Sequence, residues 1–289
     1  MTIHRFLIAR QFIDEERGTV RCQSKKLVRQ IRKVLRLENG NQVDVLDGQG
    51  NVYHCVLQNV RSGVAPDVFQ AQITGKEKSI EPVGIRLTIA MPLIKTSRFE
   101  WALEKLTELG ADKIVPIALS RSVIKTQPFS KLARWRKIIE EATEQCERSR
   151  VPELMAPLGF SDWLHQNEQA QDNALRLICI ERQTAQSLEE VLCNFRNRQT
   201  NSFVGVDCID PWASFLRCRG STVSTQNRMQ SAPTLSCAIA VGAEGGFSEE
   251  EIQAALTKNF IPVSLGSHIL RSETAAIYAL SISTSMLAG

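Results

Sequence analysis

The sequence predicts an α/β protein with a mostly parallel sheet, preceded by a small β-barrel. From residue 85 onward, short apolar runs alternate with amphipathic helical patterns, and strand–helix alternation of this kind is typical of parallel sheets. Before that point, several short strand patterns follow a basic helix, which favours a small barrel. At 289 residues the chain is long enough for two domains, predicted to cover residues 1–75 and 76–289.

The N-terminal domain carries a concentration of positive charge. Eight basic residues and no acidic residue lie between positions 17 and 36. Apolar residues in this stretch recur at helical spacing, so a helix would bury Leu27, Ile31, Val34 and Leu35 and turn its basic side chains to solvent. An ordinary surface mixes both signs of charge. This face therefore favours contact with phosphate groups, and the alternative is a merely solvated helix face.

Strand patterns follow the basic helix. They are short, and turns rich in Gly, Asp, Asn and Ser separate them; they cover residues 42–46, 51–57 and 68–74. Short strands beside a helix predict the barrel of the first domain.

The second domain begins with an apolar strand pattern at residues 85–91. A capping box formed by Ser97 and Glu100 predicts the start of a helix, and Gly110 predicts its end. An amphipathic pattern over residues 131–149 predicts a longer helix. Further apolar runs predict strands at residues 114–119, 175–180 and 237–241.

A polar stretch interrupts this alternation. Residues 194–234 are rich in Asn, Gln, Ser, Thr and Arg and are interpreted as a loop insertion, although they contain Trp212, Phe215 and Leu216. After the next strand, Ser248 and Glu251 form a second capping box that predicts another helix.

The most informative segment is the glycine loop at residues 242–247, which follows the apolar run 237–241. Glycine allows backbone groups to approach a ligand closely, so the loop is a candidate ligand site. It lacks the glycine spacing of a dinucleotide loop and the lysine of a P-loop. Glu244 inside the turn disfavours a pyrophosphate and tolerates a neutral or cationic ligand such as an adenosine or a sulfonium. The alternative is a glycine hairpin packed beneath a helix.

Two C-terminal segments together carry a family resemblance. The first is Gly242, Glu244, Gly245, Gly246, Phe247 and Ser248 in the glycine loop; the second is Leu265, Gly266, Ile269, Leu270, Arg271, Glu273, Thr274 and Ala275. With the Val-Leu-Arg run at 34–36, Lys105 with Glu108-Leu109-Gly110, and the run at 144–153, they closely resemble the RsmE-type methyltransferases. This family belongs to the SPOUT class and methylates N3 of a uridine in 16S ribosomal RNA. Three departures from its pattern are Ala243 in place of proline, Gln30 in place of histidine, and a connection before the glycine strand that is longer than in the family.

The resemblance implies the details of fold and cofactor. It implies a SPOUT-type parallel sheet with a C-terminal trefoil knot, and a PUA-like RNA-binding barrel at the N-terminus. The cofactor would be S-adenosylmethionine. The cofactor-binding residues would be Ile180, Glu181, Gly242, Glu244, Gly245, Gly246, Leu265, Gly266, Ile269, Leu270, Arg271 and Thr274.

Methylation of uridine N3 also requires that the N3 proton leave. Arg271 is the first candidate for stabilising the developing uracil anion, and Glu273 and Glu244 are candidate proton acceptors. The competing interpretation of Glu273 is a carboxylate placed at the start of a helix because the macrodipole favours it. The apolar side chains of the cofactor set have plain core packing as their alternative role.

RNA contact is predicted for exposed basic residues, with surface salt bridges as the alternative. These residues are Arg5, Arg10, Lys25, Arg29, Arg32, Lys33, Arg36, Arg121, Arg148 and Arg150. The implied partners are 16S rRNA or the small ribosomal subunit and a second copy of the chain in a homodimer.

The composition limits which metal sites, locations and other functions are expected. Eight cysteines and four histidines are scattered without zinc-type spacing, so no metal is expected. No apolar run approaches the roughly 20 residues that cross a bilayer, and a cytoplasmic location without membrane contact is expected. Two other functions remain open: a catalytically silent RNA-binding protein of ribosome assembly, and a nucleotide-dependent oxidoreductase, although the fingerprint glycines of the latter are absent.

Overall fold

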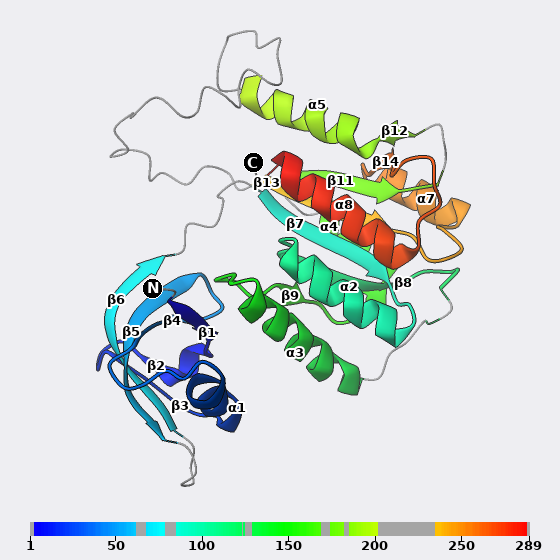
Figure 1. Ribbon diagram of the computed structural model, residues 1–289. Helices are drawn as coiled ribbons and strands as arrows, with labels where there is room; N and C mark the ends of the chain where they lie inside the picture. The colour runs from blue at the N-terminus through cyan, green and yellow to red at the C-terminus, as the bar shows by residue number, and fades with distance from the viewer. Residues whose placement is uncertain are drawn as a thin grey trace.

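The computed structural model describes residues 3–61, 68–78, 85–122, 124, 129–168, 174–181, 185–201 and 235–287. Two sheets organise these residues, one in each half of the chain (Figure 1). Most of the predicted polar insertion, including Trp212, Phe215 and Leu216, lies outside the described residues, and its beginning belongs to helix α5 (Leu188–Asn201).

The N-terminal sheet has six strands in the order β1-β4-β5-β6-β3-β2. β1 and β4 are parallel, and the other pairs are antiparallel. The strands are β1 (His4–Leu7), β2 (Ile13–Asp14), β3 (Thr19–Gln23), β4 (Gln42–Leu46), β5 (Asn51–Arg61) and β6 (Val68–Lys78). A 3-10 turn, η1 (Arg10–Phe12), joins the first two strands. The last strand passes residue 75, the predicted domain boundary, and continues to Lys78.

The basic helix of this domain is shorter than its sequence pattern predicts. Helix α1 (Lys25–Arg29) is capped by Ser24, whose hydroxyl accepts from the Leu27 amide, and it continues as one π-helical turn, η2 (Gln30–Val34). The wider turn changes the angular spacing of the side chains. Leu27 and Ile31 are buried as predicted, but Val34 is 69% exposed, so the prediction that Val34 packs in the core was wrong.

The C-terminal sheet is parallel throughout, in the order β10-β8-β7-β13-β11-β14-β12, with β9 also paired to β8. Its central strand β13 lies between β7 and β11 although it comes late in the chain. The strands are β7 (Ile85–Pro92), β8 (Lys113–Ala118), β9 (Glu153–Leu154), β10 (Leu158–Gly159), β11 (Ala174–Cys179), β12 (Gln186–Ser187), β13 (Leu235–Val241) and β14 (Ile261–Ser264).

Helices cover both faces of this sheet (Figure 1). One face is covered by α2 (Thr96–Glu108), α3 (Phe129–Gln145), α5 and α8 (Ser272–Leu287), and the other by α4 (Phe160–Glu168) and α7 (Glu249–Thr257). Each face has its own apolar core, one containing Trp135 and Phe99 and the other containing Trp163 and Phe247. The sheet is therefore buried on both sides, as parallel sheets require.

The two predicted capping boxes have different outcomes. At Ser248 the hydroxyl accepts from the Glu251 amide at 3.2 Å, and the Glu251 carboxylate accepts from the Ser248 amide at 2.8 Å. At Ser97 no capping box forms, because α2 begins earlier, with Lys95 at the N-cap and no side-chain cap.

Main-chain hydrogen bonds join the two halves of the molecule. The Gly50 amide donates to the Ser149 carbonyl, and the Val151 amide donates to the Gly48 carbonyl, both at 3.0 Å. Between them, Gln49 and Arg150 form an antiparallel bridge. An ion pair between Lys26 of α1 and Glu141 of α3 at 2.7 Å lies in the same junction.

Candidate functional site

The candidate site is built at the carboxyl ends of the central strands. β13 ends at Val241 and passes directly into the glycine loop. The Gly246 amide donates to the Ala243 carbonyl at 2.8 Å, and Gly246 has a positive φ of 68°, so glycine suits this position. The Ser248 capping box then starts α7 and holds the end of the loop in place.

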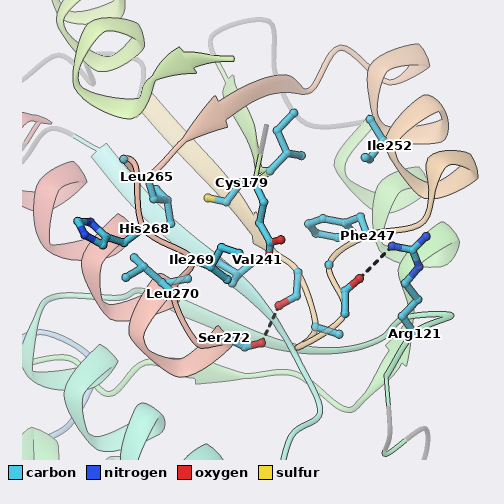
Figure 2. A pocket seen from close by; sticks show the side chains of 18 of the residues that line it. Arg121, Cys179, Val241, Phe247, Ile252, Leu265, His268, Ile269, Leu270 and Ser272 are labelled. Carbon is cyan, nitrogen blue, oxygen red and sulfur yellow. Dashed lines mark hydrogen bonds between the residues drawn. The ribbon is translucent and has the colours of Figure 1, made fainter. Parts of the chain in front are cut away.

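A second turn faces the glycine loop. It leaves β14, contains Gly266 at a φ of 111°, and leads into α8 at Ser272. The Ser272 hydroxyl donates to the Gly242 carbonyl at 2.8 Å, as Figure 2 shows. The start of α8 is thereby tied to the glycine loop.

Between these turns lies a cavity of about 460 Å³. Its walls come from the ends of β11 and β13, the glycine loop, the start of α7 and the turn before α8 (Figure 2). A volume of this size is within the range of small-molecule sites. Much of the wall is aliphatic or aromatic, and the glycines of the two turns bring backbone groups to it.

The charged and reactive groups of the cavity are few. Arg121, Glu181 and Glu249 are the ionic side chains among the described lining residues, and Arg121 Nη1 donates to the Gly245 carbonyl at 2.9 Å. Burial raises the pKa of the Cys179 thiol to about 12, so this thiol stays protonated at neutral pH and is a poor nucleophile.

Most of the predicted cofactor-binding residues lie together in this wall. They are Ile180, Glu181, Gly242, Gly245, Gly246, Leu265, Gly266, Ile269 and Leu270. Ile269 is 79% exposed, so its side chain is not part of an ordinary core. Glu244, Arg271 and Thr274 are exposed and are not among the lining residues.

The candidate catalytic residues divide into two groups. Glu244 and Glu273 are both bound to Arg98 of α2: Arg98 Nη1 donates to Glu244 Oε1 at 2.7 Å, and Arg98 Nε lies 3.6 Å from Glu273 Oε1. Arg271 lies apart from them on the turn before α8, exposed to solvent. Arg98 carries no motif signal, because its carboxylate partners are far away in sequence.

The sequence reasoning also missed several lining residues. Phe247 and Cys179 are adjacent to predicted positions and were visible as the ends of the glycine loop and of a strand pattern. Arg121 was predicted to contact RNA rather than the cavity. The other lining residues outside the predicted set are Val241, Ala243, Glu249, Ile252, Ser267, His268, Ser272 and Ala275.

The predicted RNA-binding residues lie in different environments. Five of them are exposed on α1, η2 and the residues just after, without an ion pair to any described residue: Lys25, Arg29, Arg32, Lys33 and Arg36. Arg5 pairs with buried Asp44 at 3.5 Å, and Arg10 pairs with Glu15 at 2.6 Å. The five exposed residues of the first group are named here the α1 surface.

Arg148 and Arg150 are turned toward the protein. Arg148 Nη1 donates to the Thr107 and Ala111 carbonyls at 3.0 and 2.8 Å, and the side chain is 16% exposed. It therefore holds the end of α2 and is removed from the set expected to contact RNA. The Arg150 guanidinium lies over Gly50, in the junction between the two halves of the molecule.

Within the described residues, the helices are all too short or too polar to span a membrane. No group of three or more His, Cys, Asp or Glu side chains that could hold a metal ion is found among the described residues either.

Comparison with known proteins identifies both halves of the chain. A family model for an RNA methyltransferase domain matches residues 81–206 and 214–284, and a model for an RNA methyltransferase PUA domain matches residues 31–62. The chain is 32% identical over 250 residues to the ribosomal RNA small subunit methyltransferase E of Synechocystis sp., covering 86% of this chain and 68% of that protein. The Bacillus subtilis protein of the same name is 28% identical over 88% of this chain and 85% of its own length.

Solved structures share the fold along nearly the entire chain. A crystal structure of the ribosomal RNA small subunit methyltransferase E from Neisseria gonorrhoeae, bound to S-adenosyl methionine, superposes with a TM-score of 0.68 at 22% identity and covers 98% of each chain. A crystal structure of a hypothetical protein gives the same TM-score at 28% identity, also covering 98% of each chain. The predicted SPOUT-type parallel sheet with a PUA-like domain is confirmed, and the trefoil knot stays a prediction.

Proposed function

The chain belongs to the ribosomal RNA small subunit methyltransferase E family of RNA methyltransferases, and from this premise we propose that it methylates N3 of a uridine in 16S ribosomal RNA with S-adenosylmethionine as the methyl donor. The observation that carries the proposal is the cavity enclosed by the glycine loop and the turn before α8. This is the place in an open parallel sheet where ligands bind.

The residues of the cavity fit this methyl donor. Backbone groups of the two turns provide donors and acceptors for an adenosine, and Leu265, Leu270 and Phe247 provide apolar surface for the adenine ring. Glu181 and Glu249 supply negative charge for a ligand that carries a sulfonium, and among the described lining residues they outnumber the one guanidinium, that of Arg121. A Cβ atom on Gly242 would lie 3.2 Å from the Phe247 ring, so the loop is closed tightly around this space.

The donor supplies an electrophilic methyl group on sulfur, and the protein supplies position and electrostatics. The backbone of Gly245, Gly246, Gly266 and Ile269 would hold the nucleoside. We place Arg271 and Thr274 at the rim of the cavity rather than in its wall. Glu273, buried against Arg98, is proposed to position that arginine.

RNA would approach from the N-terminal domain. The α1 surface presents Lys25, Arg29, Arg32, Lys33 and Arg36 without acidic partners among the described residues, which suits contact with phosphates. Because bases are paired or stacked in the folded RNA, the target uridine must be extruded before its N3 can react. We further propose that two copies of the chain form a homodimer and that the protein acts in the cytoplasm on 16S rRNA or the small ribosomal subunit.

Mass spectrometry of small-subunit rRNA tests this proposal directly. A strain that lacks the protein is expected to lose one 3-methyluridine from that RNA, and a plasmid copy is expected to restore it. Retention of every 3-methyluridine would contradict the proposed specificity.

Calorimetry separates the proposed methyltransferase from the two competing functions. Binding of S-adenosylmethionine and not of NAD supports a methyltransferase. Binding of neither ligand would favour a silent RNA-binding protein, and binding of NAD alone would favour an oxidoreductase.

A further inference from the structure

A second cavity adjoins the first at the glycine loop. It has a volume of about 360 Å³, and Ala243 contributes to the walls of both cavities. Its other walls come from the segment after β7, the first turn of α2, and the turn after β8. The two cavities therefore meet at Ala243, and direct methyl transfer requires the base to reach past this residue to the donor.

The polar wall of this second cavity contains Arg98 and Glu244, together with Lys95 and Ser122. The Arg98 guanidinium is bound at two places: Nη1 donates to Glu244 Oε1 at 2.7 Å, and Nε lies 3.6 Å from Glu273 Oε1. The Glu273 carboxylate is only 6% exposed, and its Oε2 atom has no hydrogen-bond partner among the described residues. A buried carboxylate requires a nearby positive charge, so Glu273 holds Arg98 in position from the protein side, while Glu244 is half exposed and able to exchange its partner.

The opposite wall of the cavity is apolar. Leu93, Ile94 and Ile124 provide it. A planar ring lies well against such side chains, and the polar edge of that ring would then meet Arg98 and Glu244. The cavity thus combines an apolar face with a polar side on which the Arg98 guanidinium is paired with the Glu244 carboxylate.

The polar edge of uracil matches this pair of groups. Its N3–H is a donor, and the carbonyl oxygens on either side are acceptors. When N3 loses its proton, negative charge spreads onto those two oxygens. A carboxylate beside N3 and a guanidinium beside a carbonyl oxygen would respectively accept the proton and stabilise the anion.

We propose that the second cavity receives the extruded uracil base, with Glu244 as the proton acceptor and Arg98 as the group that stabilises the developing uracil anion. This inference rests on the proposed function. The N3–H bond breaks and its proton passes to Glu244, while the electron pair left on N3 forms the bond to the methyl carbon. The carbon–sulfur bond breaks at the same time, and its electron pair remains on sulfur. Before the base enters, Arg98 is paired with the Glu244 carboxylate, and the entering uracil separates the two side chains.

The arrangement also discriminates between pyrimidines. Cytosine N3 is unprotonated at neutral pH, so its lone pair would face the Glu244 carboxylate. Cytosine N3 and the carboxylate are both acceptors, and no proton would lie between them to form a hydrogen bond. Such an unmatched polar contact in a confined site lowers affinity.

The test uses the full-length protein with Arg98→Lys and Glu244→Gln. The substrate is 16S rRNA, or small subunits, from the strain that lacks the protein. Neither residue is among those that line the first cavity, so calorimetry is expected to give an unchanged Kd for S-adenosylmethionine in both variants. The kcat for methyl transfer is expected to fall at least about 100-fold in each.

A binding measurement gives a readout that a merely structural role would not change. RNA fragments that carry the target uridine, or cytidine at that position, are compared for affinity. The wild-type protein is expected to bind the uridine fragment more tightly, and Glu244→Gln is expected to bring the two affinities close to equal, because an amide can donate to cytosine N3.

Arg134→Lys is the matched control. Arg134 also forms a carboxylate pair with α2, through Glu100 at 2.6 Å, but it lines neither cavity. Its kcat and affinity ratio are expected to equal those of the wild type.

The outcomes separate this inference from the proposed function. If the wild type methylates the RNA and both variants keep its kcat and its preference for uridine, the proposed role of the second cavity is overturned. The methyltransferase activity would then stand. Loss of S-adenosylmethionine binding in either variant would overturn it as well, because these residues would then serve the first cavity. A wild-type protein that neither binds the donor nor methylates the RNA would overturn both.

Discussion

The Ser272 hydroxyl and the Gly242 carbonyl are joined by a 2.8 Å hydrogen bond, across 30 residues of the chain. It connects the first turn of α8 to the first residue of the glycine loop, and Ser272 is 2% exposed. The two segments that enclose the cavity are therefore held together by a group that also belongs to the cavity wall.

Replacement of Ser272 by alanine is expected to lower the free energy of unfolding by about 1–3 kcal/mol, because a carbonyl would be left buried without this donor. Affinity for S-adenosylmethionine is expected to fall as well. Urea unfolding and calorimetry measure the two effects. Ser283→Ala is the control, since the Ser283 hydroxyl bonds to the Ala279 carbonyl within the same helix and its removal costs less; equal effects of the two substitutions would contradict this interpretation.

Gly242→Ala is expected to weaken donor binding about 10- to 100-fold. The added Cβ would lie 3.2 Å from the Phe247 ring and 3.3 Å from Gly246 Cα, so the loop must shift, at a cost of about 1–3 kcal/mol. Calorimetry measures the change. At Gly245 a Cβ would meet only the Arg121 side chain, at 3.5 Å, and a smaller decrease in affinity is expected; a larger decrease there would show that loop closure at Gly242 is not the limiting contact.

Arg148→Ala is expected to destabilise the protein by about 2–3 kcal/mol, because two carbonyls at the end of α2 lose a charged donor. Chemical denaturation measures the change. Arg134→Ala is a suitable comparison, since Arg134 is 69% exposed and a surface ion pair contributes little to stability. Similar values for the two variants would argue against an inward role for Arg148.

Substitution of Arg29, Arg32 and Lys33 by glutamine is expected to weaken RNA binding and to reduce its salt dependence. For single-stranded RNA the slope of log K against log salt should fall by about 0.7 for each phosphate that the protein no longer neutralises. Binding titrations over a range of salt concentrations measure this slope. Arg86→Gln, at the beginning of β7 and away from the cavity end of that strand, should leave the slope unchanged; an unchanged slope in the triple variant would show that the α1 surface does not bind the RNA.

The junction between the domains is expected to respond to pH through Glu144. Burial raises the pKa of this carboxyl. The charge of Lys26 and the hydrogen bond to Gln30 lower the pKa, but their effect is smaller than that of burial. A raised carboxyl pKa in the folded state means that stability is lost as pH rises through that value and is regained below the ordinary value of 4.5. Glu144→Gln should therefore raise the melting temperature at pH 7 and have little effect near pH 4. Equal shifts at both pH values would contradict this.

The sequence predicts local features of the fold better than distant pairings. The Ser248 capping box and the glycine loop were visible because their hydrogen bonds join residues within a few positions of each other. The position of β13 between β7 and β11 depends on strands far apart in the chain, and no local periodicity carries that information. Val34 was misplaced because a π-helical turn cannot be distinguished from an α-helix by apolar spacing.

The candidate site shows the same division. The glycine loop was predicted as a ligand site because its glycines let backbone groups approach a ligand closely, and the turn before α8 was added by the family resemblance. Arg98 was not predicted, because its partner Glu244 is 146 residues away and nothing in its own neighbourhood marks it. Arg148 was assigned to RNA for a related reason: a basic residue near a helix end looks the same in sequence whether it faces solvent or a carbonyl.

The antiparallel bridge between Gln49 and Arg150 joins the two halves of the molecule through their main chains. Hydrogen bonds between main-chain atoms survive almost any exchange of side chains except proline. The main-chain hydrogen bonds that flank this bridge are therefore expected to keep the two halves of the molecule in the same relative position when the side chains of Gln49 or Arg150 are substituted.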